Sequence, residues 1–183
     1  MRNLSNLFLV NMPHLNQDPI FGHSLIYIHH HNKFGAMGLI INKPFNRNES
    51  KIILNEIGLN KNHINSDVYF GGPVSPDKGF IIHDGKNNND GTLDVSEVAS
   101  ISSTNKILND INNDVGPNNF RLIMGYSGWE QGQLEYELEN GDWMLLPSSE
   151  NVIFANESKD QWNVAISKLD ININNFTGQS GIS

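Results

Sequence analysis

The sequence predicts an α+β (mixed α/β) fold, in which a partly curled sheet carries helices on its outside. Apolar runs of strand length are interspersed with segments of helical spacing, without a regular strand–helix–strand alternation. Three glycine-centred segments each follow or open onto an apolar run, so we interpret them as sharp turns at the edge of a sheet; they lie at residues 31–44, 71–74 and 125–135. With 183 residues, no internal repeat and no long linker, the chain is expected to form a single domain over residues 1–183, with room for two lobes.

The first third of the chain predicts three strands. Leu7–Val10 is a short apolar run of the kind that forms a buried strand. Ser24–His31 alternates between two faces, and Met37–Ile41 follows it after a tight connection, so the two are expected to form a hairpin. Pro44 ends the second of them, because proline has no N–H to donate to a neighbouring strand.

The middle of the chain predicts one helix and three short strands. Glu49–Leu59 has apolar residues at helical spacing, and Gly58 is placed to cap its C-terminus. Val68–Phe70, Gly79–His83 and Val98–Ile101 are apolar runs of strand length.

The last part of the chain predicts three helices, two strands and one turn. A cap at Ser103 or Thr104 opens a helix that runs through Val115. The next elements are expected to be a buried strand at Arg121–Met124, a turn at Gly125–Gly132 leading into a short helix, and a strand at Trp143–Leu146. Lys159–Leu169 is the clearest amphipathic helix, because apolar residues recur there at i, i+3, i+4 and i+7: Trp162, Ala165, Ile166 and Leu169.

Charge and composition exclude several classes of function. The net charge is −8, from 12 Lys+Arg against 20 Asp+Glu, and no basic cluster is present, so we do not expect direct nucleic-acid binding. The absence of cysteine excludes disulfides, zinc–thiolate sites, Fe–S clusters and thiol catalysis. No stretch approaches the ~18 apolar residues of a membrane helix. The run Leu7–Val10 is too short for the apolar region of a signal peptide, so we expect a cytoplasmic location and no membrane partner.

Two polar segments are interpreted as loosely structured. The asparagine-rich run Lys86–Gly91 reads as a flexible loop, and Thr177–Ser183 as a loose Gly/Ser-rich end. Neither is assigned a function.

The three consecutive histidines His29, His30 and His31 do not predict a metal site. Successive side chains of a strand point to opposite faces, so only His29 and His31 would share a metal. A zinc site needs three or four convergent ligands, and nothing in the sequence brings His23 or His83 to them. We therefore expect no metal and no cofactor.

The glycine segments also fail the templates of known catalytic loops. Gly35–Gly38 leads into a strand and lacks the fingerprint of a nucleotide-binding loop. In Gly125–Trp129 the second glycine follows Ser127 directly, which is the wrong spacing for a nucleophile elbow. A turn that opens a helix can nevertheless bind an anion or a polar ligand through its backbone N–H groups.

The order and spacing of these segments resemble the YqgE/AlgH family of uncharacterised bacterial proteins nearly end to end. The matching pieces are residues 7–13, 18–21, 31–44, 71–74, 79–83, 125–135, 143–147, 153–154 and Trp162. The resemblance implies a bifurcated, mostly antiparallel sheet curled into a pseudo-barrel with helices packed outside, and a cytoplasmic protein. The AlgH name implies transcriptional regulation, although the family has no recognised DNA-binding motif and no established enzymatic activity. This chain departs from the family in having Gly178-Gln179-Ser180 where a Gly-His-Ala tail is common, and Ser127 where alanine is common.

The preferred hypothesis is a non-enzymatic regulatory or small-ligand-binding domain, with an unidentified small ligand or protein as its partner. The glycine turns are expected to build one cleft, lined by Asn32, Asn42, Lys43, Gly72, Tyr126, Trp129 and Gln133. No catalytic residue is predicted. The alternative is a hydrolase or transferase that acts on a small polar substrate in the same cleft, with Glu135 or a histidine as base. This alternative requires His31 or His83 beside an acidic partner. The oligomeric state is left open.

Overall fold

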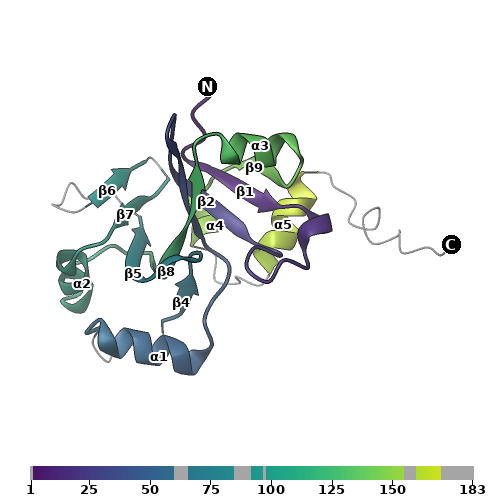
Figure 1. Cartoon of the computed structure of the whole chain (residues 1–183). Coiled ribbons are helices and arrows are strands. Elements are labelled where there is room, and N and C mark those ends of the chain that lie inside the picture. Colours follow the sequence, from purple (N-terminus) through teal and green to yellow (C-terminus); the bar gives the residue numbers. More distant parts are fainter. Residues whose placement is uncertain (1, 60–65, 85–91, 97, 155–159, 170–183) are drawn as a thin grey trace.

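The computed structural model describes residues 2–59, 66–84, 92–96, 98–154 and 160–169 (Figure 1). The predicted loop at Lys86–Gly91 and the predicted loose end at Thr177–Ser183, with its Gly178-Gln179-Ser180 departure, lie outside the described residues.

One nine-stranded sheet forms the centre of the molecule, in the order β6-β7-β5-β8-β3-β2-β1-β9, with β4 also paired with β8. The strands are β1 (Leu7–Asn11), β2 (Leu25–Asn32), β3 (Gly35–Ile40), β4 (Val68–Phe70), β5 (Val74–His83), β6 (Thr92–Val95), β7 (Ser100–Ser102), β8 (Phe120–Glu130) and β9 (Trp143–Pro147). Every described pairing is antiparallel except that of β4 with β8. The α+β class and the predicted hairpin of β2 with β3 are therefore confirmed.

The sheet is bifurcated at β8. The first half of β8 pairs with β5 on one side and with β4 on the other, whereas its second half pairs with β3. The long strand β8 thus belongs to two half-sheets, one running to β6 and one to β9 (Figure 1). Among the described strands β6 and β9 do not pair with each other, so the curled sheet stays open.

The predicted turn at Gly125–Gly132 is wrong, because residues up to Glu130 continue β8. Gly125, at φ +72°, only kinks the strand at the fork, and a turn with Gly132 at φ +77° follows the strand. The glycines here allow two backbone segments to lie in direct contact. The segment between β4 and β5 lies directly against β8, where Gly71 N–H donates to the carbonyl of Met124 over 2.8 Å. A Cβ added at Gly72 would lie 2.3 Å from the carbonyl carbon of Tyr126.

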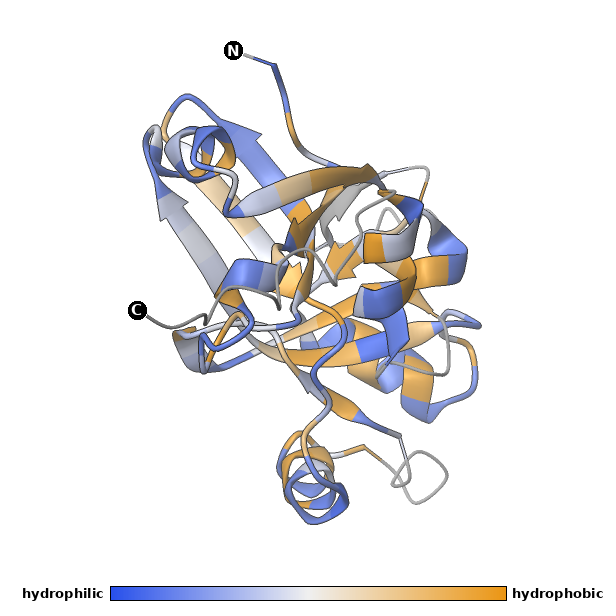
Figure 2. Cartoon of the chain, turned by 90° about the vertical axis from the view of Figure 1, so that its right-hand side faces the viewer, coloured by the Kyte–Doolittle hydropathy of each residue, from blue (hydrophilic) through white to orange (hydrophobic). Residues whose placement is uncertain are grey.

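The helices cover the faces of the sheet, as the amphipathic patterns predict. They are η1 (Pro13–Leu15, 3₁₀), α1 (Arg47–Glu56), α2 (Asn105–Asn112), α3 (Gln133–Glu139), α4 (Glu150–Ile153) and α5 (Gln161–Lys168). Trp162 and Ile166 of α5 enter one core cluster, Leu134 of α3 a second, and Leu54 of α1 with Ile107 of α2 a third. Apolar segments accordingly gather on the central strands, and the helices carry both polar and apolar residues (Figure 2).

The predicted helix ends are confirmed in part: Thr104 is the N-cap residue of α2 but makes no capping hydrogen bond through its side chain, and α2 ends at Asn112, before Val115. Asn46 and Glu49 form a reciprocal capping box at the start of α1, and Gly58, at φ +75°, follows its end as predicted. Among the described residues, no helix has both the length and the hydrophobicity needed to cross a membrane.

A bulge in β2 corrects the predicted side-chain alternation. The pairing with β3 shifts between Ile28 and His30, so that His31 lies opposite Ala36. Paired residues share a face of the sheet, and Ala36 packs in the same core cluster as Ile28. His31 therefore lies on the Ile28 face and not on the Tyr27 face, which changes what it can contact.

Candidate functional site

A shallow hollow of about 670 Å³ lies over the second half of β8 and the β2–β3 hairpin. Four of the predicted site residues line it together: Asn32, Tyr126, Trp129 and Gln133. The remaining lining residues are His30, Phe34, Gly35, Ala36, Met37, Val74, Gly128 and Glu130. The Gly35 and Gly128 segments do meet here, but as paired strands, with Met37 opposite Gly128, and not as turns.

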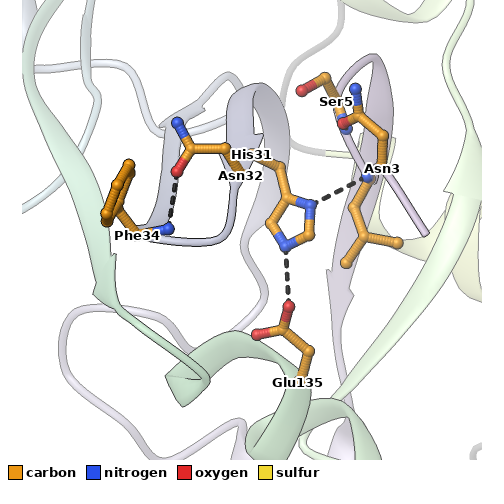
Figure 3. A network of polar contacts seen from close by, with 7 residues as sticks. Asn3, Ser5, His31, Asn32, Phe34 and Glu135 are labelled. Atoms are coloured by element: carbon orange, nitrogen blue, oxygen red, sulfur yellow. Dashed lines mark hydrogen bonds and ion pairs between the residues drawn. The ribbon is translucent and has the colours of Figure 1, made fainter. Parts of the chain in front are cut away.

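The polar side chains at the rim of the shallow hollow are held by local hydrogen bonds. Asn32 accepts from the backbone N–H of Phe34 over 2.8 Å (Figure 3). Its Nδ2 also contacts the ring of His30 over 2.7 Å. Gln133 accepts from the backbone N–H of Glu130 over 2.9 Å. Both side chains are solvent-exposed, so their remaining hydrogen-bonding capacity faces water.

The other three predicted site residues do not line the shallow hollow. Asn42 is buried and accepts from Leu25 N–H over 2.8 Å while donating to the carbonyl of His23 over 2.9 Å, so it ties the end of β3 to the start of β2. Lys43 donates through Nζ to the carbonyl of Ile20. Burial lowers the pKa of Lys43, and the nearby Asp18 partly opposes that shift. Gly72 lies against the backbone of β8 at the contact described above.

His31 and Glu135 form the most conspicuous polar contact near the shallow hollow. Nε2 of His31 lies 3.0 Å from Oε1 of Glu135 on α3, and the histidine side chain is 1% exposed. On its other side the ring accepts from the backbone N–H of Leu4 through Nδ1, over 3.1 Å (Figure 3). Since Nδ1 accepts, the ring proton lies on Nε2 and is donated to Glu135.

This arrangement suits a structural role better than general-base catalysis. Both ring nitrogens of His31 are engaged, and His30, not His31, lines the shallow hollow. His83 is similar: it is fully buried, Nδ1 donates to the carbonyl of Asp84 over 2.9 Å, and Nε2 accepts from Ser102 over 3.0 Å. No group of three or more potential metal ligands occurs among the described residues.

The His31→Ala substitution is expected to lower the free energy of unfolding by about 2 kcal/mol, because it removes a buried ring with two hydrogen bonds. The matched control is His30→Ala, one residue earlier on the exposed face, for which a change within about 0.5 kcal/mol is expected. Urea denaturation of both variants measures the difference. Equal losses would contradict the structural role of His31.

A second, smaller cavity of about 200 Å³ adjoins the shallow hollow, and we call it the tryptophan cavity. Three of its lining residues, Gly128, Trp129 and Gln133, also line the shallow hollow, so the two spaces are neighbours. Its other lining residues are Asn11, Leu15, Asp18, Phe21, Glu137, Asp142 and Trp143. The rings of Trp129 and Trp143 are nearly perpendicular, at 82°, with centroids 6.3 Å apart.

Glu137 organises the walls of the tryptophan cavity. Its Oε2 accepts from Nε1 of both Trp129 and Trp143, each over 2.8 Å. Its Oε1 accepts from Nε2 of Gln133 over 2.9 Å. One carboxylate therefore fixes two indoles and an amide from three elements, β8, β9 and α3.

Sequence reasoning missed most of the tryptophan cavity, since only Trp129 and Gln133 were predicted to bind a ligand. One signal was present: Asn11 directly follows the apolar run of β1, and its register places it beside Trp143 on the same face. A polar residue at an inward position of a buried strand indicates either a structural hydrogen bond or a site. Phe21, Glu137 and Asp142 carried no comparable local signal.

Comparisons with known proteins agree over almost the whole chain. The AlgH-like family model, DUF179, matches residues 8–174. A UPF0301 protein of Baumannia cicadellinicola subsp. Homalodisca coagulata is 36% identical over 185 residues, and one of Vibrio vulnificus is 37% identical over 186 residues; each alignment covers 98% of both chains. The solution structure of the AlgH protein from Pseudomonas aeruginosa is 34% identical, covers 99% of this chain and 96% of its own, and has a TM-score of 0.76. A crystal structure of a Corynebacterium diphtheriae protein, 19% identical with a TM-score of 0.74, shares the fold.

Proposed function

The chain belongs to the AlgH-like family of uncharacterised proteins, and from that premise we propose that it is a small-ligand-binding domain with a regulatory, non-enzymatic role. The ligand lies in the shallow hollow and extends into the tryptophan cavity. The observation that carries this proposal is the meeting of four polar and aromatic residues, from the β2–β3 hairpin, β8 and the start of α3, in one depression: Asn32, Tyr126, Trp129 and Gln133.

The hydrogen bonds of the nearby side chains support ligand binding rather than catalysis. His31 and His83 use both ring nitrogens within the fold, and Glu137 accepts three N–H groups. A general base needs a free lone pair directed at the substrate. The exposed amides of Asn32 and Gln133 and the rings of Tyr126 and Trp129 instead offer hydrogen bonds and stacking.

One observation favours the alternative of a hydrolase or transferase. His31 does have an acidic partner, Glu135, within hydrogen-bond distance, as that alternative requires. Yet the ring lies beneath the surface and donates its proton to Glu135, so a substrate in the shallow hollow would meet neither nitrogen. The pair would have to open before it could act.

The regulatory role within this proposal works through a protein partner, in the cytoplasm. The net charge of −8 disfavours contact with a phosphate backbone, so transcription would be affected indirectly. A bound ligand that changes the surface around Phe34 and Val74, both exposed at the rim of the shallow hollow, would alter what docks there.

The Gly128→Val substitution tests the proposal by filling the site. Gly128 lines both spaces, and an added Cβ would meet only side chains, at 3.4 Å from Tyr126 and 3.8 Å from Val74. Valine also favours a strand more than glycine does, so folding stability is expected to be kept or to rise by about 0.5 kcal/mol. Ligand binding is expected to fall by about ten-fold or more, through steric exclusion.

The matched control is Gly79→Val, on the neighbouring strand β5, where the added Cβ would lie 3.7 Å from the sulfur of Met124 and outside both spaces. Wild type and the two variants are purified from the host and analysed by native mass spectrometry. Each ¹⁵N-labelled protein is then mixed with a small-molecule extract of the same cells, and its amide chemical shifts are followed by NMR. We expect a ligand mass and saturable chemical-shift changes for wild type and Gly79→Val, but not for Gly128→Val. No adduct and no shift in wild type would overturn the proposal.

A further inference from the structure

We propose that the tryptophan cavity binds a small alkylammonium cation that carries a neutral oxygen, such as a hydroxyl. This inference rests on the proposed function, since the tryptophan cavity adjoins the shallow hollow, and it names the ligand class. Three features of the wall carry it: the sign of its charge, its aromatic rings and an unused buried donor.

The charge on the wall is negative. Asp18, Glu137 and Asp142 line the tryptophan cavity, and no lysine, arginine or histidine of the described part of the chain does. Two basic groups outside the lining offset part of this charge: Lys43 interacts with Asp18, and Nε2 of His14 lies 3.6 Å from Asp142, so the three carboxylates still outnumber them. An anion would meet three carboxylates in this confined space, whereas a cation is stabilised by them.

The aromatic rings in the wall of the tryptophan cavity also favour a cation. Phe21 stands at 84° to Trp143, and Trp143 at 82° to Trp129, so the rings close the space from more than one direction. Both indole N–H groups donate to one carboxylate oxygen of Glu137. Donation to an anion raises the electron density of an indole, and an ammonium ion over its face is then bound more tightly.

A buried donor indicates the second part of the ligand. Asn11 is fully buried and lines the tryptophan cavity, with its Oδ1 accepting from His23 N–H over 3.0 Å. Its Nδ2 has no acceptor within the described part of the chain. An orphaned amide donor in a buried site is costly, and a ligand oxygen would satisfy it. Among carboxylates that oxygen is best uncharged, which points to a hydroxyl or a carbonyl.

The experiment compares three probes that differ in one property each. Choline carries a quaternary ammonium and a hydroxyl; 3,3-dimethyl-1-butanol is its uncharged isostere; ethyltrimethylammonium keeps the charge and the carbon chain without the hydroxyl. Each is titrated at millimolar concentration and constant ionic strength into ¹⁵N-labelled protein. The indole N–H signals of Trp129 and Trp143 report on the site, and the backbone N–H signal of Gly79, which lies on β5 outside both spaces, is the internal reference.

Choline is expected to shift the Trp129 and Trp143 signals saturably, and the isostere to bind about ten-fold more weakly. Ethyltrimethylammonium is expected to bind about five-fold more weakly than choline, because it leaves Asn11 unsatisfied. The Asp142→Asn substitution should weaken the binding of choline about five-fold. The Glu139→Gln substitution, on the exposed face of α3, should leave the affinity for choline unchanged.

Two results would overturn the inference. Equal affinity for choline and its isostere would mean an apolar site, and the proposed small-ligand function would still stand. No saturable shift with choline would exclude the cation, and the response to the cell extract would then decide separately whether the shallow hollow binds another ligand. If the extract also gave no shift, both proposals would fail.

Discussion

Replacing Gly72 by alanine is expected to cost about 4 kcal/mol of folding free energy, which is most of the stability of a marginally stable domain. Gly72 has φ +146°, and an added Cβ would lie 2.3 Å from the carbonyl carbon of Tyr126 and 2.5 Å from the backbone nitrogen of Ser127. These atoms belong to the backbone of β8, which is paired with β3 and β5 on either side of this point, so it cannot move aside cheaply. Urea denaturation, or loss of soluble expression, measures the effect.

The control for this substitution is Gly141→Ala. Gly141 also has a left-handed conformation, at φ +77°, but an added Cβ would meet no atom within 4 Å. Only the conformational cost remains, about 1 kcal/mol. If the two alanine variants lost the same stability, the steric account of the backbone contact would be incorrect.

The Glu137→Ala substitution is expected to cost about 3 kcal/mol, since it removes one acceptor from two buried indoles. Trp129 and Trp143 are only 7% and 5% exposed, so neither N–H can turn to water without moving its ring. Glu137→Gln keeps an acceptor oxygen for both indoles and should cost about 1 kcal/mol. Chemical denaturation followed by tryptophan fluorescence measures both the stability and the change in the indole environment.

Glu139→Ala is the matched control, because Glu139 lies on the exposed face of the same helix. A change within about 0.5 kcal/mol is expected there. A Glu137→Ala protein as stable as this control would show that the indole hydrogen bonds contribute little, and the rigidity assigned to the tryptophan cavity would have to be given up.

Local patterns were sufficient for most elements of the fold. Apolar runs located β1, β4 and the hairpin of β2 with β3, and Gly58 marked the end of α1. The sequence misled at Gly125–Glu130, because a glycine-rich stretch is typical of a turn, whereas here glycine is needed for contact with another backbone. That need arises from Gly71 and Gly72, more than fifty residues earlier, and it has no local sign.

The candidate site was predictable only in part, for a related reason. Trp129 and Gln133 were predicted because they lie within or directly beside the glycine-rich segment at residues 125–135. The partners that shape the site are remote: Glu135 lies 104 residues from His31, and Asn11 pairs with Trp143 across β1 and β9. The bulge in β2 also determines on which face of the sheet His31 lies. A single extra residue in a strand does not change the pattern of apolar and polar residues enough to be recognised in the sequence.

The forked strand has a consequence for how such a domain can be inherited. Strands β1 to β3 depend on β8 and β9 from the far end of the chain, and β4, β5 and β7 depend on the first half of the same β8. Splitting the coding sequence anywhere before β8 leaves the N-terminal piece without the strand that completes its sheet. The gene is therefore expected to pass between genomes whole, and to gain new parts only at its ends or in loops.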